Sequence, residues 1–129
     1  MGQFEYLQFL IDEAIKAGNH SLVLSRPFTF DEIRDDGQMH INASNFTLDL
    51  HGYYLDAGGH CRIFNITGEN VTIKNIRFRN GDAINGNCSD PTSTNGGAIL
   101  WCGKYGEIIN SQFINNTGTY GGGLYLNSS

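Results

Sequence analysis

The sequence predicts an all-β fold, a right-handed parallel β-helix of about four coils of 25 residues, with an α-helix over its amino-terminal end. Segments of like residue type recur 25 residues apart, since Asn45–Leu48 returns as Asn70–Ile73 and Gly96–Trp101 returns as Gly121–Leu126. Between these pairs the spacing is 35 residues, which an insertion of ten polar, turn-forming residues at 84–93 explains. A fixed period in this range is typical of a solenoid, in which each coil buries its apolar face only against its neighbours.

The composition agrees with short strands joined by tight turns. The chain of 129 residues contains 17 glycines, and only 16% of its residues are charged. Its length fits a single domain. The net charge of −5 argues against binding to nucleic-acid phosphates, because such binding relies on dense Lys and Arg.

Residues 4–17 are predicted to form one amphipathic helix that stops at Gly18. The first coil of a solenoid needs a cover, and an isolated apolar stripe needs a partner. We therefore expect this helix to be an amino-terminal cap. Its apolar residues recur at helical spacing, and they are Phe4, Leu7, Leu10, Ile11, Ala14 and Ile15.

Residues 21–24 and 28–30 are short strand candidates separated by Pro27, and with a turn at 35–37 they are expected to form an irregular first coil. The chain then divides into a cap with this first coil, residues 1–44, and the regular coils, residues 45–129.

From Met39 onward, inward-facing apolar residues are expected to alternate with polar residues and to fall into three rows. Three rows per turn predict a triangular coil with three parallel sheets, and the chirality of L-residues favours right-handed winding. The first row holds Phe46, Leu48, Val71, Ile73, Gly106 and Ile108; the second holds Phe64, Ile66, Ile99, Trp101, Leu124 and Leu126; the third holds Tyr53, Phe78 and Phe113.

Asparagines recur beside the turns between rows. Asn75 and Asn110 share one position of the repeat, and Asn80 and Asn115 share another. Stacked identical amides can hydrogen-bond from coil to coil. The sequence therefore predicts asparagine ladders at these turns.

Two groups of residues resemble known repeat families. Gly96–Ile99 and Phe113–Asn116 are similar to the GGAI and FxxN signatures of polymorphic outer-membrane protein repeats, and residues 48–68 resemble the opening coils of adhesin-like β-helix proteins of methanogenic archaea. The resemblance covers about residues 40–129 and implies a pectin-lyase-like β-helix in a large surface protein, with adhesion as its role. Because such proteins usually carry many more coils, this chain is expected to be a fragment of a larger one.

No catalytic, cofactor-binding or metal-binding residues are expected. Glycoside hydrolysis needs two carboxylates about 5–10 Å apart, whereas here they are scattered over different coils and turns. The four histidines share no spacing typical of a metal site. Lys74, Arg77 and Arg79 project from one coil, as a solvated face or as a weak contact for an anionic glycan. The carboxylates considered are Asp49, Asp56, Glu69, Asp82, Asp90 and Glu107.

The three cysteines contain no C-x-x-C pair. In an oxidising compartment we expect a Cys88–Cys102 disulfide with Cys61 reduced, and buried, unpaired cysteines are the alternative. Among eight N-x-S/T sequons, the one at Asn87 in the insertion is the best glycosylation candidate. No stretch has the pattern of a signal peptide or of a membrane span.

The function expected from these features is non-catalytic adhesion or display at the cell surface or outside the cell. The lateral sheet faces and residues 84–95 would contact a carbohydrate or a ligand on a partner cell. The alternatives are a fragment of a polysaccharide lyase or glycoside hydrolase of the same fold, and a purely structural spacer. Because no cap follows the last coil, we expect either further coils or tail-to-tail self-association there.

Overall fold

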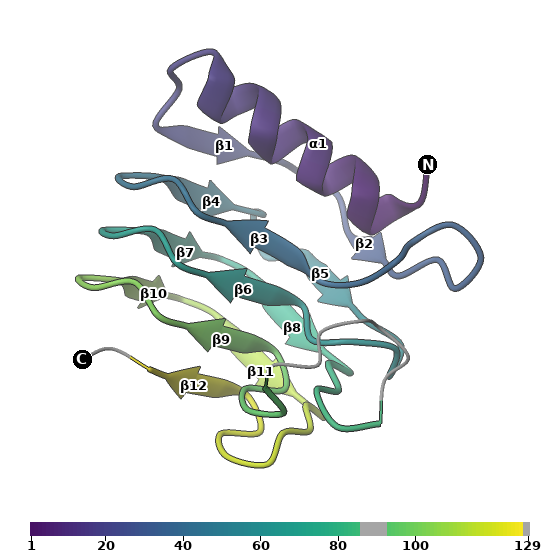
Figure 1. The fold of residues 1–129 in the computed structure, drawn as a ribbon. Helices are drawn as coiled ribbons and strands as arrows, with labels where there is room; N and C mark the ends of the chain where they lie inside the picture. Colours follow the sequence, from purple (N-terminus) through teal and green to yellow (C-terminus); the bar gives the residue numbers. More distant parts are fainter. Residues whose placement is uncertain (86–92, 128–129) are drawn as a thin grey trace.

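The computed structural model describes residues 1–85 and 93–127, which form a parallel β-helix covered at one end by an α-helix (Figure 1). The helix, α1, spans Gln3–Lys16. The strands are β1 (Ser21–Val23), β2 (Phe28–Thr29), β3 (Met39–Ile41), β4 (Thr47–Asp49), β5 (Tyr54–Asp56), β6 (Phe64–Ile66), β7 (Thr72–Lys74), β8 (Arg77–Arg79), β9 (Ile99–Trp101), β10 (Glu107–Ile109), β11 (Gln112–Ile114) and β12 (Leu124–Leu126).

The strands stack into three parallel sheets, one for each side of the coil. The first sheet has the order β1-β4-β7-β10, the second β2-β5-β8-β11 and the third β3-β6-β9-β12. Each sheet therefore contains one strand from each of four coils in the described part of the chain, as the 25-residue repeat predicts. Strands β1, β2 and β3 pair in register with the second coil, so the first coil belongs to the same stack.

The core is the column of side chains that the three sheets enclose. The predicted first row is confirmed by the parallel pairs Leu48 with Ile73 and Ile73 with Ile108. The predicted second row is confirmed by the parallel pairs Phe64 with Ile99 and Ile99 with Leu124. Leu48, Phe64, Ile73 and Ile99 are fully buried.

The predicted third row is wrong at Tyr53. Leu55 pairs with Phe78 in the second sheet, while Tyr53 is 42% exposed. The turn before Leu55 is two residues longer than the turn before Phe78, and a shorter return to Phe64 restores the 25-residue period. A fixed period cannot detect two length changes that cancel within one coil.

Helix α1 lies across the first coil and presents its apolar stripe to the core, as predicted from its spacing (Figure 1). Phe4, Leu7, Ile11 and Ala14 are buried. The helix ends at Lys16 with Ala17 as its C-cap, and the following Gly18 takes a φ of +81°, a left-handed conformation that glycine adopts without steric cost.

Two glutamines of α1 bind the backbone edge of the first coil. The Thr29 amide donates to Gln3 Oε1 at 2.9 Å, and the His40 amide donates to Gln8 Oε1 at 2.6 Å. Gln8 Nε2 in turn donates to the His40 carbonyl at 3.0 Å. These side-chain amides replace the neighbouring strand that β2 and β3 lack on this side, so the cap satisfies polar groups as well as covering apolar ones.

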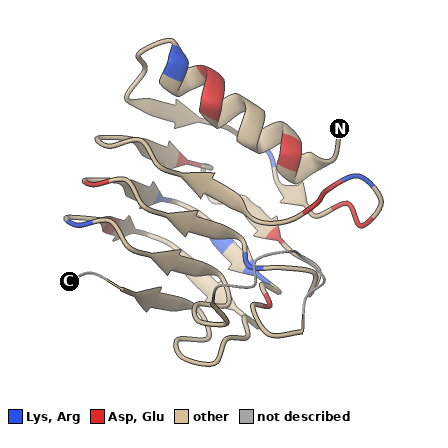
Figure 2. Cartoon of the chain, in the orientation of Figure 1, with Lys and Arg blue, Asp and Glu red and all other residues tan. Residues whose placement is uncertain are grey.

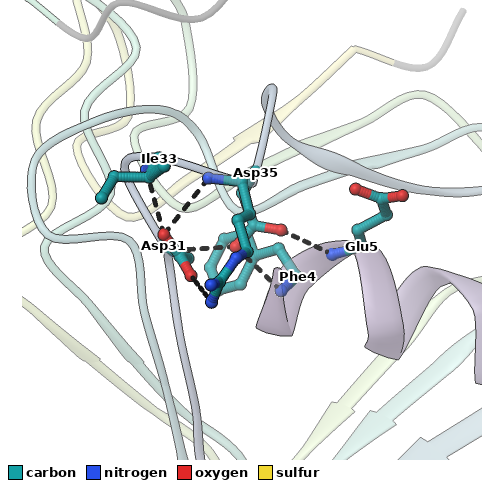
Figure 3. A network of polar contacts seen from close by, with 6 residues as sticks. Phe4, Glu5, Asp31, Ile33 and Asp35 are labelled. Atoms are coloured by element: carbon teal, nitrogen blue, oxygen red, sulfur yellow. Dashed lines mark hydrogen bonds and ion pairs between the residues drawn. The ribbon is translucent and has the colours of Figure 1, made fainter. Parts of the chain in front are cut away.

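Asp35 holds the amino terminus of α1 from the loop after β2 (Figure 3). Its carboxylate accepts the amides of Phe4 at 3.1 Å, Glu5 at 2.9 Å and Asp31 at 2.8 Å. A helix amino terminus favours a negative charge and needs acceptors for its first amides. Gly2 makes no side-chain cap, and a Cβ there would lie 2.1 Å from Asp35 Oδ1.

Asparagines at the corners let each coil turn and also join it to the next coil. Asn110 donates to Asn75 Oδ1 at 2.8 Å, which confirms that ladder, and Asn75 donates on to Asp49 at 3.1 Å. At the next corner Asn80 donates to Asp56 at 3.0 Å. The left-handed backbone that these corners require is tolerated by asparagine better than by most residues. The asparagines with a φ between 48° and 60° are Asn45, Asn70, Asn75, Asn80, Asn110 and Asn115.

Replacement of Ile73 by Asp should destabilise the protein by several kcal/mol, because it places an unpaired carboxylate in the closed core. The neighbouring Thr72→Asp points outward between Thr47 and Glu107. Its only expected cost is repulsion from Glu107, below about 1 kcal/mol. Chemical denaturation of both variants measures the difference, and equal loss would contradict the register.

Replacement of Asp35 by Ala should cost about 1–3 kcal/mol, because it leaves three amides without their acceptor. Asp36→Ala, one residue along and exposed, serves as the matched control. The helical circular dichroism signal of Asp35→Ala should also decrease before the β signal on heating. Identical melting of the two variants would show that Asp35 does not hold the cap.

Candidate functional site

The outer face of the second sheet carries two rows of polar and aromatic side chains. In the first row Tyr54, Arg77 and Gln112 lie opposite one another on β5, β8 and β11. In the second row Asp56 and Arg79 occupy the corresponding positions two residues later. Neighbouring strands are about 4.8 Å apart, so the first row repeats a polar or aromatic group at that spacing on three strands, whereas the second row continues into the apolar Ile114 on β11. We refer to these five residues as the lateral face.

The lateral face arises from strict alternation along three-residue strands. Leu55 and Phe78 point into the core and are fully buried, so the residues on either side of them must point outward. Phe113 continues this inward row and stacks on Phe78 with ring centroids 5.1 Å apart. The apolar row therefore fixes where the outward side chains stand.

Arg79 is held by its neighbours, whereas Arg77 is exposed. The Arg79 guanidinium lies 3.8 Å from the centre of the Tyr54 ring and 3.7 Å from Asp56 Oδ2. The cation–π contact and the ion pair together hold the guanidinium in place. The Arg79 Nε–H is buried and has no acceptor among the described residues. Arg77 stands beside this group with an exposed side chain.

Lys74 does not belong to the lateral face. It ends β7 in the first sheet, where its position pairs with Asp49, and the corner at Asn75 separates it from Arg77. Of the predicted contact residues Lys74, Arg77 and Arg79, the structure thus places only the two arginines on one face. Figure 2 shows the few basic residues of this region among mostly uncharged strands.

A polar hollow continues the lateral face at the carboxyl ends of β5, β8 and β11. Its volume is about 260 Å³. The residues that line it are Gly58, Gly59, Asn80, Gly81, Asp82, Asn115 and Thr117. The Arg79 and Asp56 row leads into this hollow, because Asn80 follows Arg79 and Gly58 lies two residues after Asp56. The face and the hollow form one polar surface without an enclosed pocket.

Three of the aspartates weighed for catalysis are used to build turns. Asp49 accepts the His51 amide at 2.9 Å, Asp56 accepts the Gly58 amide at 2.8 Å, and Asp82 accepts the Ile84 amide at 2.9 Å. Each carboxylate closes the turn that follows its own strand or bridge. This arrangement explains why the chain carries aspartates outside the core without gathering them around one point.

Partial burial raises the pKa of Asp49, but hydrogen bonds from the His51 amide and the Asn75 side chain outweigh this effect, so the pKa lies below its ordinary value. The nearby Lys74 and His51 act in the same direction. The Asp49 carboxylate is therefore ionised in the folded protein at neutral pH. It serves as an acceptor at the end of a ladder, and a proton-donating role there is disfavoured.

Other predicted features fall partly outside the described residues. Cys88 and Asn87 lie in residues 86–92, so the Cys88–Cys102 disulfide and glycosylation at Asn87 stay predictions. Cys102 is half-buried after β9, and Cys61 is fully buried. Across residues 1–85 and 93–127, no group of three or more His, Cys, Asp or Glu side chains could hold a metal ion. In the same part of the chain no helix is long and apolar enough to cross a membrane.

Arg62 is an important residue that the sequence pattern does not reveal. It is only 2% exposed, and its guanidinium donates to the carbonyls of Ser93, Asn95 and Gly96 and to Gln38 Oε1. Arg62 therefore fixes the chain where it returns from the insertion to β9. A single arginine between a cysteine and an isoleucine carries no local signal for this role, because its partners are distant in the sequence and most of them are backbone carbonyls more than 30 residues away.

No protein-family model, curated protein or solved structure matches this chain significantly.

The Asp49 ladder should make stability depend on pH. Because the folded-state pKa of Asp49 is lowered, its ionised form contributes stability above the ordinary value of about 3.9, and this contribution is lost as the pH falls through the lower folded value. Asp49→Asn should therefore be less stable than the wild type at about pH 6, and the difference in the free energy of unfolding should narrow as the pH falls below about 3.9. Urea titrations measure the free energy of unfolding of the wild type and of Asp49→Asn at each pH, and Glu69→Gln serves as a control at an exposed carboxylate. A difference between the wild type and Asp49→Asn that does not change with pH would contradict this account.

Proposed function

We propose that this protein is a non-catalytic β-helix module of a cell-surface or extracellular protein, and that it adheres to an acidic polysaccharide through the lateral face. The observation that carries the proposal is the row of Tyr54, Arg77 and Gln112, with Arg79 and Asp56 beside it. The similarity of the repeats to adhesin-like and polymorphic outer-membrane proteins supports the same role.

The chemistry of the lateral face suits an extended chain of sugars. Arginine and glutamine offer planar groups of hydrogen-bond donors to carboxylates and hydroxyls. Their repetition from coil to coil lets a linear polymer lie along the solenoid axis. The exposed Arg77 is the main electrostatic contact, because Arg79 is already engaged by Asp56 and Tyr54.

The positions of the aspartates favour adhesion over cleavage. Cleavage of a glycosidic bond by hydrolysis needs one carboxyl group as acid and another as base or nucleophile at a suitable distance. Asp49, Asp56 and Asp82 instead accept hydrogen bonds from their own turns. The alternative is that the chain is a fragment of a polysaccharide-cleaving enzyme. Such an enzyme would release shorter sugar chains, whereas an adhesion module would not.

Binding of polygalacturonate should be measured by isothermal titration calorimetry, with dextran as a neutral polymer of similar length. Arg77→Ala should weaken binding to polygalacturonate by about fivefold or more, because it removes a charge-assisted hydrogen bond. Its melting temperature should not change, since the side chain is exposed. The affinity of the wild type for polygalacturonate should also decrease with added salt, because salt screens the attraction between Arg77 and the carboxylates of the polymer.

Lys104→Ala is the matched control, because it removes the same charge from an exposed turn outside the lateral face. Equal effects of Arg77→Ala and Lys104→Ala would reduce the interaction to net charge and overturn the proposed face. Binding to neither polymer would favour the spacer, and release of new sugar ends during incubation would show an enzyme.

A further inference from the structure

One corner of the solenoid departs from the asparagine ladder that the sequence predicts. At the corner after β7 and β10, the Asn110 side chain donates to Asn75 Oδ1 at 2.8 Å. At the corner after β8 and β11, no such hydrogen bond joins the Asn80 and Asn115 side chains among the described residues. Both asparagines still take the left-handed backbone of a corner, with φ values of 56° and 55°. The predicted ladder is therefore interrupted between Asn80 and Asn115.

The neighbouring Asn116 makes the contact between these two coils instead. Its Nδ2 donates to the Phe78 carbonyl at 3.1 Å, and its Oδ1 accepts the Gly81 amide at 2.8 Å. Asn116 thus binds the backbone of the preceding coil, whereas a ladder asparagine binds a side chain. As a consequence, Asn80 Oδ1 and the side-chain amide of Asn115 have no hydrogen-bond partner in the described part of the chain.

These unpaired groups line the polar hollow of about 260 Å³. Thr117 adds a hydroxyl that makes no hydrogen bond within the described residues, and Asp82 adds a carboxylate. Gly58 and Gly59 form another wall and have no side chains to fill the space. Sites for drug-sized ligands have volumes of roughly 300–1,000 Å³. The hollow therefore suits one small polar molecule or one residue of a polymer.

The lining of the hollow favours a neutral ligand with several hydroxyl groups. An amide oxygen or a carboxylate accepts a hydrogen bond from a hydroxyl, and an amide nitrogen donates to the same hydroxyl or to the adjacent one. No aromatic or large aliphatic side chain lines the hollow among the described residues, so an apolar ligand would gain little there. The charged residue in this lining is Asp82, which repels an anionic ligand.

We propose that the polar hollow binds a neutral sugar residue through two adjacent hydroxyl groups. The Asn115 amide and the Thr117 hydroxyl donate to the sugar oxygens, and Asn80 Oδ1 and the Asp82 carboxylate accept from the sugar hydroxyls. The interrupted ladder is what makes these groups available. The Asp82 charge makes the hollow selective for a neutral sugar over a uronic acid.

This inference also narrows the ligand of the lateral face, and for that step it rests on the proposed function. Arg77 precedes Asn80 by three residues, a separation of about 10 Å along a strand. A short oligosaccharide can span this distance. The polysaccharide that fits both places carries uronic acids for Arg77 and neutral sugars for the hollow, so the ligand class is an acidic heteropolysaccharide.

NMR titration with methyl glycosides tests the hollow separately from the lateral face. The neutral probes are the methyl glycosides of glucose, galactose, mannose and xylose, and the acidic probe is methyl glucuronide. At least one neutral glycoside should shift the backbone amide resonances of Gly59, Asn80 and Thr117. Methyl glucuronide should leave these three amides unchanged and should shift the amide of Arg77 instead.

Thr117→Val removes the hydroxyl and keeps the shape of the side chain. It should weaken binding of the neutral glycoside by about fivefold or more, because a sugar hydroxyl then lacks its partner. Thr72→Val is the matched control, because it removes a hydroxyl from an outward position on β7 and should bind as the wild type does. Asp82→Asn keeps an oxygen for the turn amides but removes the charge, so it should admit methyl glucuronide to the hollow.

Circular dichroism verifies that the three variants keep the wild-type fold. Amides of the hollow that respond to no neutral glycoside, or that respond equally in the wild type and in Thr117→Val, would overturn the inference. A response of the hollow to a neutral glycoside, together with no response of Arg77 to methyl glucuronide, would contradict the proposed function and would support the neutral sugar site by itself.

Discussion

The parallel pairing of one coil with the next, in a single register, is the interaction on which the rest of this structure depends. The strands are only two or three residues long, and such strands have no stability by themselves. Stacking gives every strand a partner and places Leu48 above Ile73 and Ile73 above Ile108. A shift by one residue would turn each of these side chains outward, so burial and register enforce each other.

The corners follow from the same constraint. A short strand can stack repeatedly only if the chain turns sharply at the same place in each coil, and asparagines in left-handed conformation provide these turns. Their amides then join the coils, as from Asn110 to Asn75 and from Asn75 to Asp49. Asp49 and Asp56 accept the last hydrogen bond of these ladders. Acidic residues that could be taken for catalytic candidates therefore have a structural role. The exposed Arg77 of the lateral face has no such structural use, so it is the residue on which the proposed contact depends.

The first coil of a solenoid poses a different problem, because stacking leaves it without a partner coil on one side. At the amino-terminal end the solution is complete: α1 covers the core, its glutamines bind the strand edge, and Asp35 binds the helix amino terminus. In the last described coil Leu126 is exposed, and the Trp101 indole has no acceptor among the described residues.

The sequence by itself determined the solenoid, because the repeat, the apolar rows and the spacing of the cap helix are all local or periodic signals. The same periodic signals predicted that Ile73 is a core residue and that the Asn75 and Asn110 side chains form a hydrogen bond. Only the tertiary structure decided what depends on turn lengths and on distant partners. Leu55 replaces Tyr53 in the core because two changes in turn length cancel, Lys74 is separated from Arg77 by a corner, and Arg62 and Asp35 bind backbone groups about 30 residues away. Such contacts leave no periodic trace in the chain, because backbone groups are the same at every position and only folding selects which of them a side chain will meet.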